Sequence, residues 1–460
     1  MKVLIVRYDE IGIKKPGTRN KMENTLISNL LASAKFYNCG KTEVKKQQGR
    51  IFLYGNVECL SNSSIKVFGV KSVSIAEELH FENINDIAQK AVEIWADKVI
   101  RKKFAVIVRR VGKHNFSSYD VARLVGEVLL KHDGKVDLDN PEIKLYIEIR
   151  DYIAYFYDNI IEGPGGLPLG SEGIAISLIS GGIDSPVSSW MIMKRGVAVD
   201  FLYCNLGSEI TKNAVLNVIY KLVEWSQGYT PKIFVADCSA ITKTIMTQTD
   251  KKIWPLVFKR ALYKIAEKIS EKMGYEAIVT GESLGQVSTQ TLPAIKTLNY
   301  QISLPMLRPL VGFDKDEITK IARKIGTYEY SEKVPEYCSI FSFHPKIKIS
   351  YNEIIEMDKK IDNAIQSVVN SVEKVDLNTN KSININDLII DKIPENSIII
   401  NLTNSAECAK GIQLSPKNVI EFIFKTGIDK NYIFCTNGDK FNIDLVSSLR
   451  KMGIKAYIIN

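Results

Sequence analysis

The sequence predicts an α/β multidomain protein: two small α+β units, a doubly wound parallel-sheet domain and a small terminal α/β unit. Its 460 residues suggest roughly three domains. With 45% hydrophobic and 25% charged residues, the composition is that of an ordinary soluble globular protein and argues against collagen-like, wholly disordered and membrane classes. Beyond residue 174, strand-like and helical runs alternate, which favours a parallel sheet covered by helices on both faces.

Charge and cysteine usage narrow the class further. The chain has 61 Lys and Arg against 52 Asp and Glu, a basic excess that suits a polyanionic partner but is equally common in proteins that bind none. The apolar start is interrupted by Arg7 and Asp9, too early for a signal peptide, and no run approaches the length of a membrane helix. We therefore expect a cytosolic protein with no membrane partner. The 7 cysteines are scattered without a CxxC pair, so we expect no zinc or iron–sulfur site and only transient disulfides.

The first two units are predicted from short, mixed runs. Strand-like runs cover residues 3–6, 50–54, 104–108, 144–149 and 153–157. Helical spacing covers residues 20–33, 85–100 and 118–131. We place the units at 1–57 and 58–162. A Gly- and Pro-rich linker at 162–170 follows them.

The later units show longer runs. Strands are expected at 174–179, 197–203, 232–236 and 277–280, and helices at 187–194, 213–226 and 256–273. We place this domain at 163–350, a helical linker at 351–380 and a terminal α/β domain at 381–460. Residues 376–386, rich in Asn, Lys and Ser, are expected to form a tether.

A phosphate loop (residues 180–186) is the most informative motif. The strand at 174–179 runs into Ser180-Gly181-Gly182-Ile183-Asp184-Ser185-Pro186, where a helix begins with Asp or Ser as its cap. Two glycines admit an anion to the backbone, and helix-start N–H groups favour phosphate. The loop is neither a Walker A motif nor GxGxxG. A capped turn without a ligand is the alternative for a bare Ser-Gly-Gly.

A second turn ends the strand near residue 279 and carries two glycines and two glutamines, up to Gln290. Such a turn can hydrogen-bond adenine or ribose, although alone it would be interpreted as a polar surface loop. Beside the phosphate loop, it indicates a nucleotide pocket.

The Ser-Gly-Gly-x-Asp-Ser turn resembles the PP-loop of ATP pyrophosphatases, which adenylate a carbonyl oxygen and release pyrophosphate. Together with the motifs at 279–292, 307–310, 314–318 and 335–338, nearly the whole chain resembles the tRNA uridine 4-sulfurtransferase (4-thiouridine synthase) family. Residues 7–11 with Lys14 resemble its ferredoxin-like start, although Asp9 stands where Gly is usual. Residues 67–70 and 109–118 are similar to its THUMP domain, and 165–168 to its domain junction.

The resemblance implies binding of ATP, Mg²⁺ and tRNA. Asp184 would assist Mg²⁺ or the leaving group. The nucleotide pocket would be formed by Ser177, Leu178, Ser180, Gly181, Gly182, Ser185, Tyr203, Cys204, Lys259, Gly281 and Gln290. At Lys259-Arg260 the family more often has two arginines, and Lys lacks the bidentate fork.

A basic turn precedes the second predicted helix of the THUMP part. It contains Arg109, Arg110, Lys113 and His114 beside Phe116, a combination that suits RNA phosphates and a stacked base. A solvated basic hairpin is the alternative on the residues alone.

Two cysteines complete the expected chemistry. Cys435 ends an apolar strand before a short loop and a helix, in a unit that resembles a rhodanese-like domain whose loop cysteine carries a persulfide. Buried packing is the alternative for this residue taken alone, and the loop departs from the usual rhodanese pattern. By resemblance, Cys338 would form a transient disulfide with Cys435 and release its sulfur.

The resemblance also implies partners. A cysteine desulfurase would load Cys435 and would itself hold the pyridoxal phosphate, and some relatives supply sulfur for the thiamine thiazole. A homodimer is one expected assembly. Two alternatives stay open: an adenylating enzyme that uses sulfide or another carrier with an inactive terminal domain, and a non-catalytic tRNA-binding protein.

Overall fold

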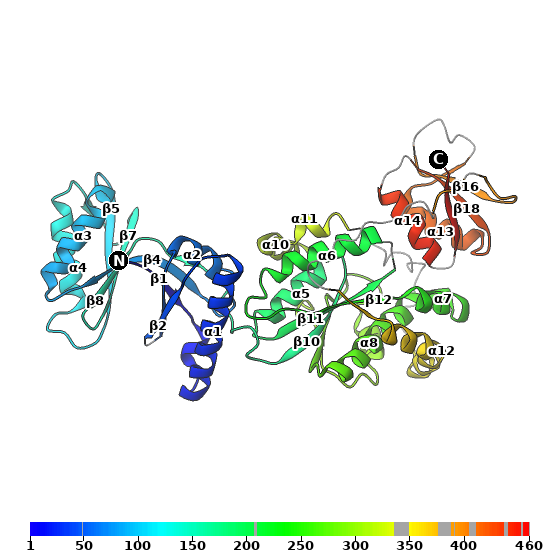
Figure 1. Cartoon of the computed structure of the whole chain (residues 1–460), viewed down its shortest axis with the longest axis horizontal. Helices are drawn as coiled ribbons and strands as arrows, with labels where there is room; N and C mark the ends of the chain where they lie inside the picture. Colours follow the sequence, from blue (N-terminus) through cyan, green and yellow to red (C-terminus); the bar gives the residue numbers. More distant parts are fainter. Residues whose placement is uncertain are drawn as a thin grey trace. The chain divides into compact units, whose positions relative to one another are not determined.

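The computed structural model describes residues 1–47, 49–206, 209–334, 349–375, 388–390, 392–403, 411–436, 440–451 and 454–459. The chain forms two compact units, coloured from blue to cyan and from green to red in Figure 1. The N-terminal unit holds residues 1–171, 194–196 and 227–229, and the C-terminal unit holds the remainder. Helices and parallel or mixed sheets build both units, so the predicted α/β multidomain class is confirmed. None of the described helices has the length and apolar character needed to cross a bilayer.

One mixed sheet organises the N-terminal unit. In the described residues its order is β2-β3-β1-β4-β8-β7-β5-β6, with β9 also paired to β4. The strands are β1 (Lys2–Arg7), β2 (Glu43–Gln47), β3 (Arg50–Tyr54), β4 (Ser72–His80), β5 (Lys103–Val111), β6 (Lys135–Val136), β7 (Ile143–Arg150), β8 (Ile153–Tyr157) and β9 (Ile161–Glu162). Strand β4 joins the two halves, because it pairs antiparallel with β1 on one edge and with β8 on the other.

Four α-helices and one 3-10 helix accompany this sheet in the described residues: η1 (Glu10–Ile13), α1 (Pro16–Phe36), α2 (Val57–Ser64), α3 (Ile84–Val99) and α4 (Ser118–Leu130). Capping boxes at Asn83 and Ser117 explain where α3 and α4 begin. Each side chain accepts a helix-start N–H, and the backbone N–H of the same residue donates to the aspartate three positions later. The fully buried Leu26 of α1 and Trp95 of α3 belong to two separate apolar cores, one for each half.

An arginine cluster (Arg7, Arg50 and Arg150 around Glu148) lies on strands β1, β3 and β7 of this sheet. Arg150 Nη2 and Arg50 Nε lie 2.6 and 3.1 Å from Glu148 Oε1, and Arg7 Nη2 lies 4.0 Å from Oε2. The Arg7 guanidinium also stacks over Tyr157 at 4.7 Å. Burial alone would raise the pKa of Glu148. Arg50 and Arg150 together outweigh this effect, so the pKa lies below its usual range.

A second sheet positions the phosphate loop. Its order in the described residues is β14-β13-β10-β11-β12-β15. The strands are β10 (Ile174–Ile179), β11 (Ala198–Asn205), β12 (Ile233–Asp237), β13 (Ala277–Val279), β14 (Met306–Leu307) and β15 (Glu373–Val375). All neighbours are parallel except β15, which pairs antiparallel with β12. The parallel sheet predicted from the strand and helix alternation is therefore present.

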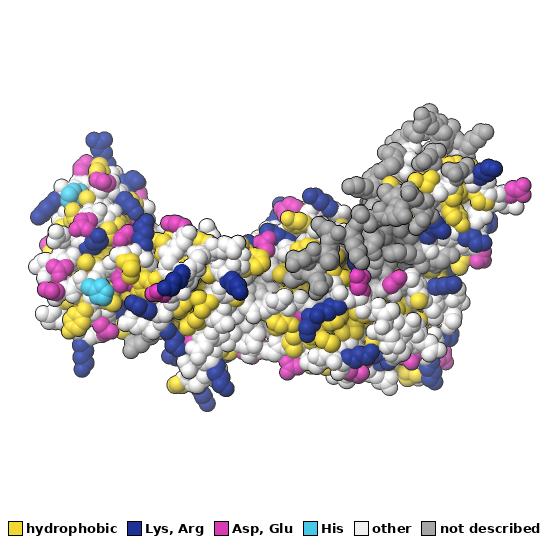
Figure 2. Space-filling model, viewed as in Figure 1, with side chains coloured by type: hydrophobic (Ala, Val, Ile, Leu, Met, Phe, Trp, Pro, Cys, Tyr) yellow, Lys and Arg dark blue, Asp and Glu magenta, His cyan; other side chains and the backbone are white. Residues whose placement is uncertain are grey.

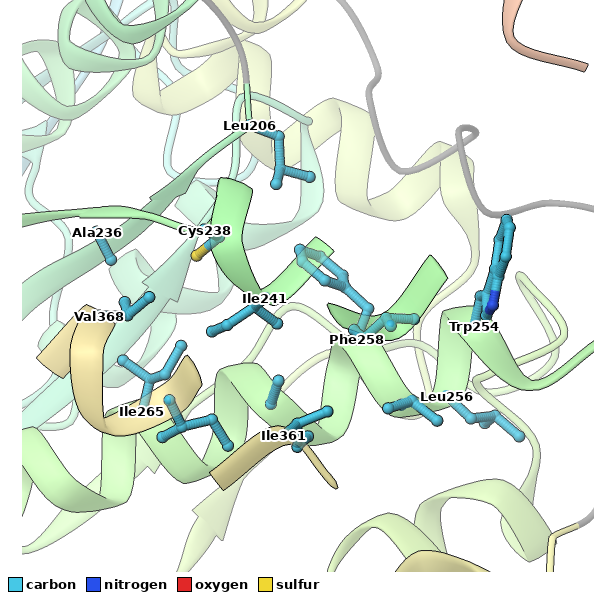
Figure 3. Close-up of a cluster of buried hydrophobic side chains, with 14 of the residues drawn as sticks. Leu206, Ala236, Cys238, Ile241, Trp254, Leu256, Phe258, Ile265, Ile361 and Val368 are labelled. Carbon is cyan, nitrogen blue, oxygen red and sulfur yellow. The ribbon is translucent and has the colours of Figure 1, made fainter. Parts of the chain in front are cut away.

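Helices surround this sheet: α5 (Asp184–Met193), α6 (Glu209–Val223), α7 (Ser239–Gln248), η2 (Lys251–Ile253), α8 (Trp254–Met273), α9 (Leu292–Leu298), α10 (Lys315–Ile325), α11 (Tyr328–Ser331) and α12 (Tyr351–Asn370). Figure 3 shows the core between three of them, which includes Ile241 of α7, Phe258 of α8 and Ile361 of α12. Helix α12 lies within the predicted helical linker at 351–380, and it packs against α7 and α8.

The terminal part has its own parallel sheet, in the order β17-β16-β18-β19 over the described residues. Its elements are β16 (Ile398–Asn401), β17 (Ile412–Gln413), α13 (Pro416–Thr426), β18 (Asn431–Cys435), α14 (Lys440–Lys451) and β19 (Lys455–Ile459). This is the small α/β unit that the sequence predicts. The predicted tether at 376–386 lies outside the described residues.

Two disulfides whose cysteines both lie in the described residues were not foreseen. Cys39 bonds to Cys59, and Cys204 bonds to Cys238, with Cα separations of 5.4 and 5.8 Å. These separations lie within the ordinary range for a disulfide. The partners are 20 and 34 residues apart in sequence, so only the fold brings them together.

Candidate functional site

The phosphate loop lies at the carboxyl end of β10, with β13 and β11 on either side. Two hydroxyls hold its shape. The Ser180 N–H donates to Ser185 Oγ at 2.9 Å, and Ser185 Oγ donates to the Ser180 carbonyl at 3.2 Å. Helix α5 begins at Asp184, so its first N–H groups lie in the same turn. The carboxyl edge of a parallel sheet together with a helix start is the usual setting for a bound phosphate.

The glycines of this region serve different purposes. A Cβ on Gly281 would lie 2.7 Å from the Ser185 nitrogen, and one on Gly181 would lie 2.0 Å from Val334 Cγ1. Both positions need glycine because neighbouring atoms already fill the space. A Cβ on Gly182 would meet only Ser180 Oγ, at 3.5 Å, so this glycine leaves room beside the loop for a ligand.

Asp184 is paired with a residue absent from the predicted site. Lys315 Nζ lies 2.7 Å from Asp184 Oδ1. Lys315 is the first residue of α10, whose capping box is formed by Asp314 and Glu317. A cation at a helix start opposes the helix dipole, and a nearby anion offsets this. That misplaced charge is the sequence signal that could have identified Lys315.

The neighbouring cations Lys259 and Arg260 face different surroundings. Lys259 Nζ lies 2.6 Å from Glu282 Oε1 and 3.4 Å from Thr289 Oγ1. Arg260 is fully buried and binds Asp358 of α12, with Nη2 2.7 Å from Oδ2. Of this pair, only Lys259 reaches the turn that carries the predicted pocket residues.

The glutamine loop (residues 281–290) closes on itself, because the Gly285 N–H donates to the Gln290 carbonyl at 2.9 Å. The Oε1 atoms of Gln286 and Gln290 are buried and have no hydrogen-bond partner in the described part of the chain. A buried polar atom without a partner is costly. The two amides are therefore suited to hydrogen bonds with a bound base or sugar, as the sequence predicts for Gln290.

The remaining predicted pocket residues are placed less favourably. Ser177 is fully buried and its hydroxyl lies 2.7 Å from Ser189 Oγ, so only its main chain can serve a pocket. Leu178 is partly buried beside it in β10. Tyr203 is buried, with its hydroxyl 3.4 Å from Asn205 Oδ1. Cys204 is occupied by its disulfide.

The basic turn of the N-terminal unit is organised around His114. Arg110 Nη1 lies 2.9 Å from His114 Nδ1, and His114 Nε2 lies 2.6 Å from the Asp151 carbonyl. Arg109 and Lys113 are exposed. The predicted cations are thus presented to solvent around one ordered ring. Figure 2 shows Lys and Arg interspersed with Asp and Glu over the visible face of this unit.

Aromatic rings adjoin the basic turn. Phe116 lies 5.0 Å from the His114 ring and 6.1 Å from Phe81, between centroids, and is itself partly buried. Tyr152 was not predicted, yet it is 69% exposed and 6.5 Å from Phe81. An exposed ring at the end of such a cluster is a better stacking surface than a half-buried one.

Cys435 is the last residue of β18, opposite Asn401 and Ile459 in the register. It is 3% exposed and disulfide-bonded. Cys338 lies outside the described residues, as do residues 437–439 between β18 and α14. The sulfur roles of both cysteines therefore stay predictions.

Three family descriptions match the chain: Thiamine biosynthesis protein (ThiI) over residues 170–363, a THUMP domain over 81–158 and a ThiI ferredoxin-like domain over 3–74. These matches confirm the ferredoxin-like, THUMP and PP-loop parts. The rhodanese-like assignment stays a prediction.

Whole-chain relatives carry one activity name. The chain is 44% identical to a tRNA sulfurtransferase of Pyrobaculum aerophilum, over 99% of this chain and 96% of that one. It is 38% identical to a tRNA sulfurtransferase of Thermoplasma volcanium, over 99% and 95%. A probable tRNA sulfurtransferase of Sulfurisphaera tokodaii is 40% identical, and its full length covers 82% of this chain.

A solved structure shares the fold. It is the crystal structure of a 4-thiouridine synthetase–RNA complex with bound ATP, with a TM-score of 0.73 and 29% identity. The match covers 82% of this chain and 100% of that one.

Proposed function

Because the chain belongs to the tRNA sulfurtransferase family, we propose that it transfers sulfur to a uridine of tRNA in an ATP-dependent reaction. One observation carries the proposal. At the end of β10, the phosphate loop adjoins Lys315 and the glutamine loop, whose Gln286 and Gln290 amides have buried oxygens without partners. Helix-start N–H groups and a lysine suit phosphates, and the amides suit an adenine or a ribose. The solved synthetase with RNA and ATP supports the same pair of substrates.

The first step we propose is adenylation of O4 of a uridine, near position 8 by family resemblance. A carbonyl oxygen is a poor leaving group, whereas AMP is a good one. The oxygen attacks the α-phosphorus of ATP and pyrophosphate departs. Lys259 and Lys315 would bind phosphate oxygens and stabilise the charge that develops there. Gly182 leaves space for their close approach to the backbone.

Mg²⁺ suits this arrangement. Asp184 supplies one carboxylate beside the loop, and Mg²⁺ is commonly held by one or two carboxylates together with substrate phosphates. When bound, the ion would neutralise phosphate charge. The Lys315 ammonium already lies 2.7 Å from the same carboxylate, so this side chain would hold Asp184 in place before the nucleotide arrives.

The second step delivers sulfur. A cysteine desulfurase would convert the Cys435 thiol into a persulfide. In one branch the outer persulfide sulfur attacks C4 and displaces AMP, and the Cys338 thiol then attacks the Cys435 sulfur, which releases the thiouridine and closes a Cys338–Cys435 disulfide. In the other branch the Cys338 thiol attacks the Cys435 sulfur first, so that hydrogen sulfide leaves, attacks C4 and displaces AMP. The route needs Cys435 to be freed from its present disulfide by a reductant.

Recognition of tRNA falls to the N-terminal unit in this proposal. Arg109, Arg110 and Lys113 would contact phosphates, while His114 and Phe116 support the turn beside Tyr152.

A second sulfur route is favoured by one observation. The probable sulfurtransferase of Sulfurisphaera tokodaii aligns in full with only 82% of this chain, and the family descriptions end at residue 363. In this route the adenylation is unchanged and the terminal domain is inactive. Either sulfide attacks C4 directly and displaces AMP, or the persulfide of another carrier passes its outer sulfur to the Cys338 thiol and the carrier leaves as a thiol.

Mass spectrometry of nucleosides tests the reaction. Unmodified tRNA is incubated with the full chain, ATP, Mg²⁺ and sulfide, and a uridine that has exchanged one oxygen for sulfur is expected only when ATP is present. Unchanged uridine in the complete mixture would refute the proposed activity. With a desulfurase and cysteine in place of sulfide, Cys435→Ser should abolish thiolation. Undiminished thiolation by that variant would instead support the second route.

A further inference from the structure

Glu282 is a buried carboxylate that the reaction proposed above does not use. It follows β13 in the glutamine loop and is 2% exposed. Its Oε1 accepts hydrogen bonds from Lys259 and Tyr263, and its Oε2 accepts from Arg308 and, at 3.0 Å, from Thr280 Oγ1. Two cations surround one anion, so this Glu282 cluster carries one net positive charge in a site largely shielded from water.

The cluster is anchored away from the glutamine loop. Arg308 Nη2 donates to Asn299 Oδ1 at 2.7 Å, and its guanidinium lies 5.8 Å from the centre of the Tyr263 ring. Arg308 and Tyr263 come from different parts of the chain: Arg308 directly follows β14, and Tyr263 belongs to helix α8. The carboxylate is therefore held from two sides, which fixes the position of any further group bound to it.

Lys259 connects this anchored carboxylate to the predicted nucleotide pocket. Its ammonium lies 2.6 Å from Glu282 and 3.4 Å from Thr289, the residue next to Gln290 in the glutamine loop. A lysine head ends a flexible four-carbon stem, and fixing it costs conformational entropy. The bond to Glu282 fixes the Lys259 head before any ligand binds.

Protonation does not weaken this arrangement at neutral pH. Burial works to raise the pKa of Glu282, but Lys259 and Arg308 outweigh it and lower the pKa to about 2. Burial, reinforced by Glu282, holds the pKa of Tyr263 well above its usual value, so this hydroxyl stays a donor. All the partners of Glu282 named above donate, and only an ionised carboxylate accepts from all of them.

We propose that Glu282 is a positioning residue that fixes the Lys259 ammonium beside the nucleotide phosphates, with Arg308 balancing the carboxylate so that a positive charge is left for ATP. The inference rests on the proposed function, because it assumes that Lys259 binds the nucleotide. It adds a residue that acts through Lys259 and does not itself touch the substrate.

Glu282→Gln tests the proposal in the full chain, with Mg·ATP binding measured by calorimetry. The amide removes the charge and places an NH₂ group against donors. We expect the Kd for ATP to rise about tenfold, as for the loss of one charge-assisted hydrogen bond, and the KM for ATP to rise with it. The KM for tRNA should not change, whereas a general defect in folding would alter both.

Glu267→Gln is the matched control. Glu267 is a buried carboxylate of α8 that accepts from the Ser303 N–H at 2.6 Å, and it is not among the groups that contact Lys259 above. Its variant should bind ATP as the wild type does. An equal loss of ATP affinity in both variants would overturn the specific role of Glu282.

A double-mutant cycle with Lys259→Met separates positioning from other effects. If Glu282 acts through Lys259, the double variant should bind ATP within about twofold of Lys259→Met alone. Losses that multiply would overturn the proposal. If Glu282→Gln does not fold, Glu282→Asp replaces it, because aspartate keeps the charge but has a shorter side chain. We expect this variant to bind ATP about threefold more weakly, and an unchanged Kd would contradict the proposal.

Binding of Mg·ATP by the wild-type chain distinguishes a failure of the proposed function from a failure of the role proposed for Glu282. If the wild-type chain binds no Mg·ATP, the proposed function is wrong. If the wild type binds ATP and Glu282→Gln binds it equally tightly, only the positioning role is wrong.

Discussion

Replacing Gly281 by alanine should disturb the phosphate loop through the first residues of α5. The added Cβ would lie 2.7 Å from the Ser185 nitrogen, 2.8 Å from Ser185 Cα and 3.0 Å from the Asp184 carbonyl carbon. These are backbone atoms at the start of α5, so no side chain can rotate to relieve the contact. To restore an ordinary separation of about 3.5 Å, the loop or the strand end has to move by about 0.8 Å.

Two magnitudes follow from that displacement. Overpacking of this kind costs about 1–3 kcal/mol of folding free energy. A misplacement of about 1 Å at a reacting centre lowers the rate about a hundredfold. Gly281→Ala should therefore reduce both the urea midpoint and the rate of tRNA-dependent pyrophosphate release, with the larger effect on the rate.

Two other glycines provide controls for this prediction. A Cβ on Gly312 meets nothing within 4 Å, so Gly312→Ala should leave both stability and rate unchanged. A Cβ on Gly182 meets only Ser180 Oγ, so Gly182→Ala should fold normally but bind ATP more weakly. If Gly281→Ala matched the wild type in both assays, the inferred contact between the glutamine loop and α5 would be refuted.

Three further predictions concern charge and covalent links. Asp184→Asn should lower the rate of pyrophosphate release about a hundredfold while the chain stays folded, and a wild-type rate would contradict its role. Glu148→Gln should destabilise the chain by about 3–5 kcal/mol in urea, because two buried guanidiniums and the partly buried Arg50 lose their anion. Since the folded pKa of Glu148 lies below the unfolded value of about 4.3, its contribution is present above that pH and lost as pH falls through the folded value; a stability gap between wild type and variant that persists at low pH would argue against this. Cys39→Ser should cost about 3 kcal/mol by opening the loop to Cys59, and an equal urea midpoint with and without reductant would contradict it.

Local patterns were sufficient for most elements because their signals lie within a few residues. The apolar run before Ser180 and the turn after it predict β10 and α5 together, and the amphipathic spacing of 256–273 predicts α8. Other elements were missed, among them strand β4 and helices α2, α9 and α10. For strand β2 and helix α7, which were also missed, the reason is physical. Strand β2 (Glu43–Gln47) is almost wholly polar and exposed, and α7 (Ser239–Gln248) is rich in Thr, which is a weak helix former.

The candidate site was predictable in part. The sequence singles out the phosphate loop and Gln290 because glycine, serine and glutamine gather there directly after predicted strands, and their roles stay predictions. The contacts that orient Lys259 and Asp184 were not found, because their partners are distant in sequence. Glu282 is 23 positions from Lys259, and Lys315 is 131 positions from Asp184, so only the folded chain reveals the pairs.

Strand β4 has a mechanical consequence for RNA recognition. Its main chain is bonded along one edge to the ferredoxin-like half and along the other to the THUMP half. A hinge motion between the halves would have to break several of these hydrogen bonds at once, so the two halves move as one rigid body. For a nucleic acid bound at the basic turn, any further contact site on this unit therefore lies at a fixed distance from that turn.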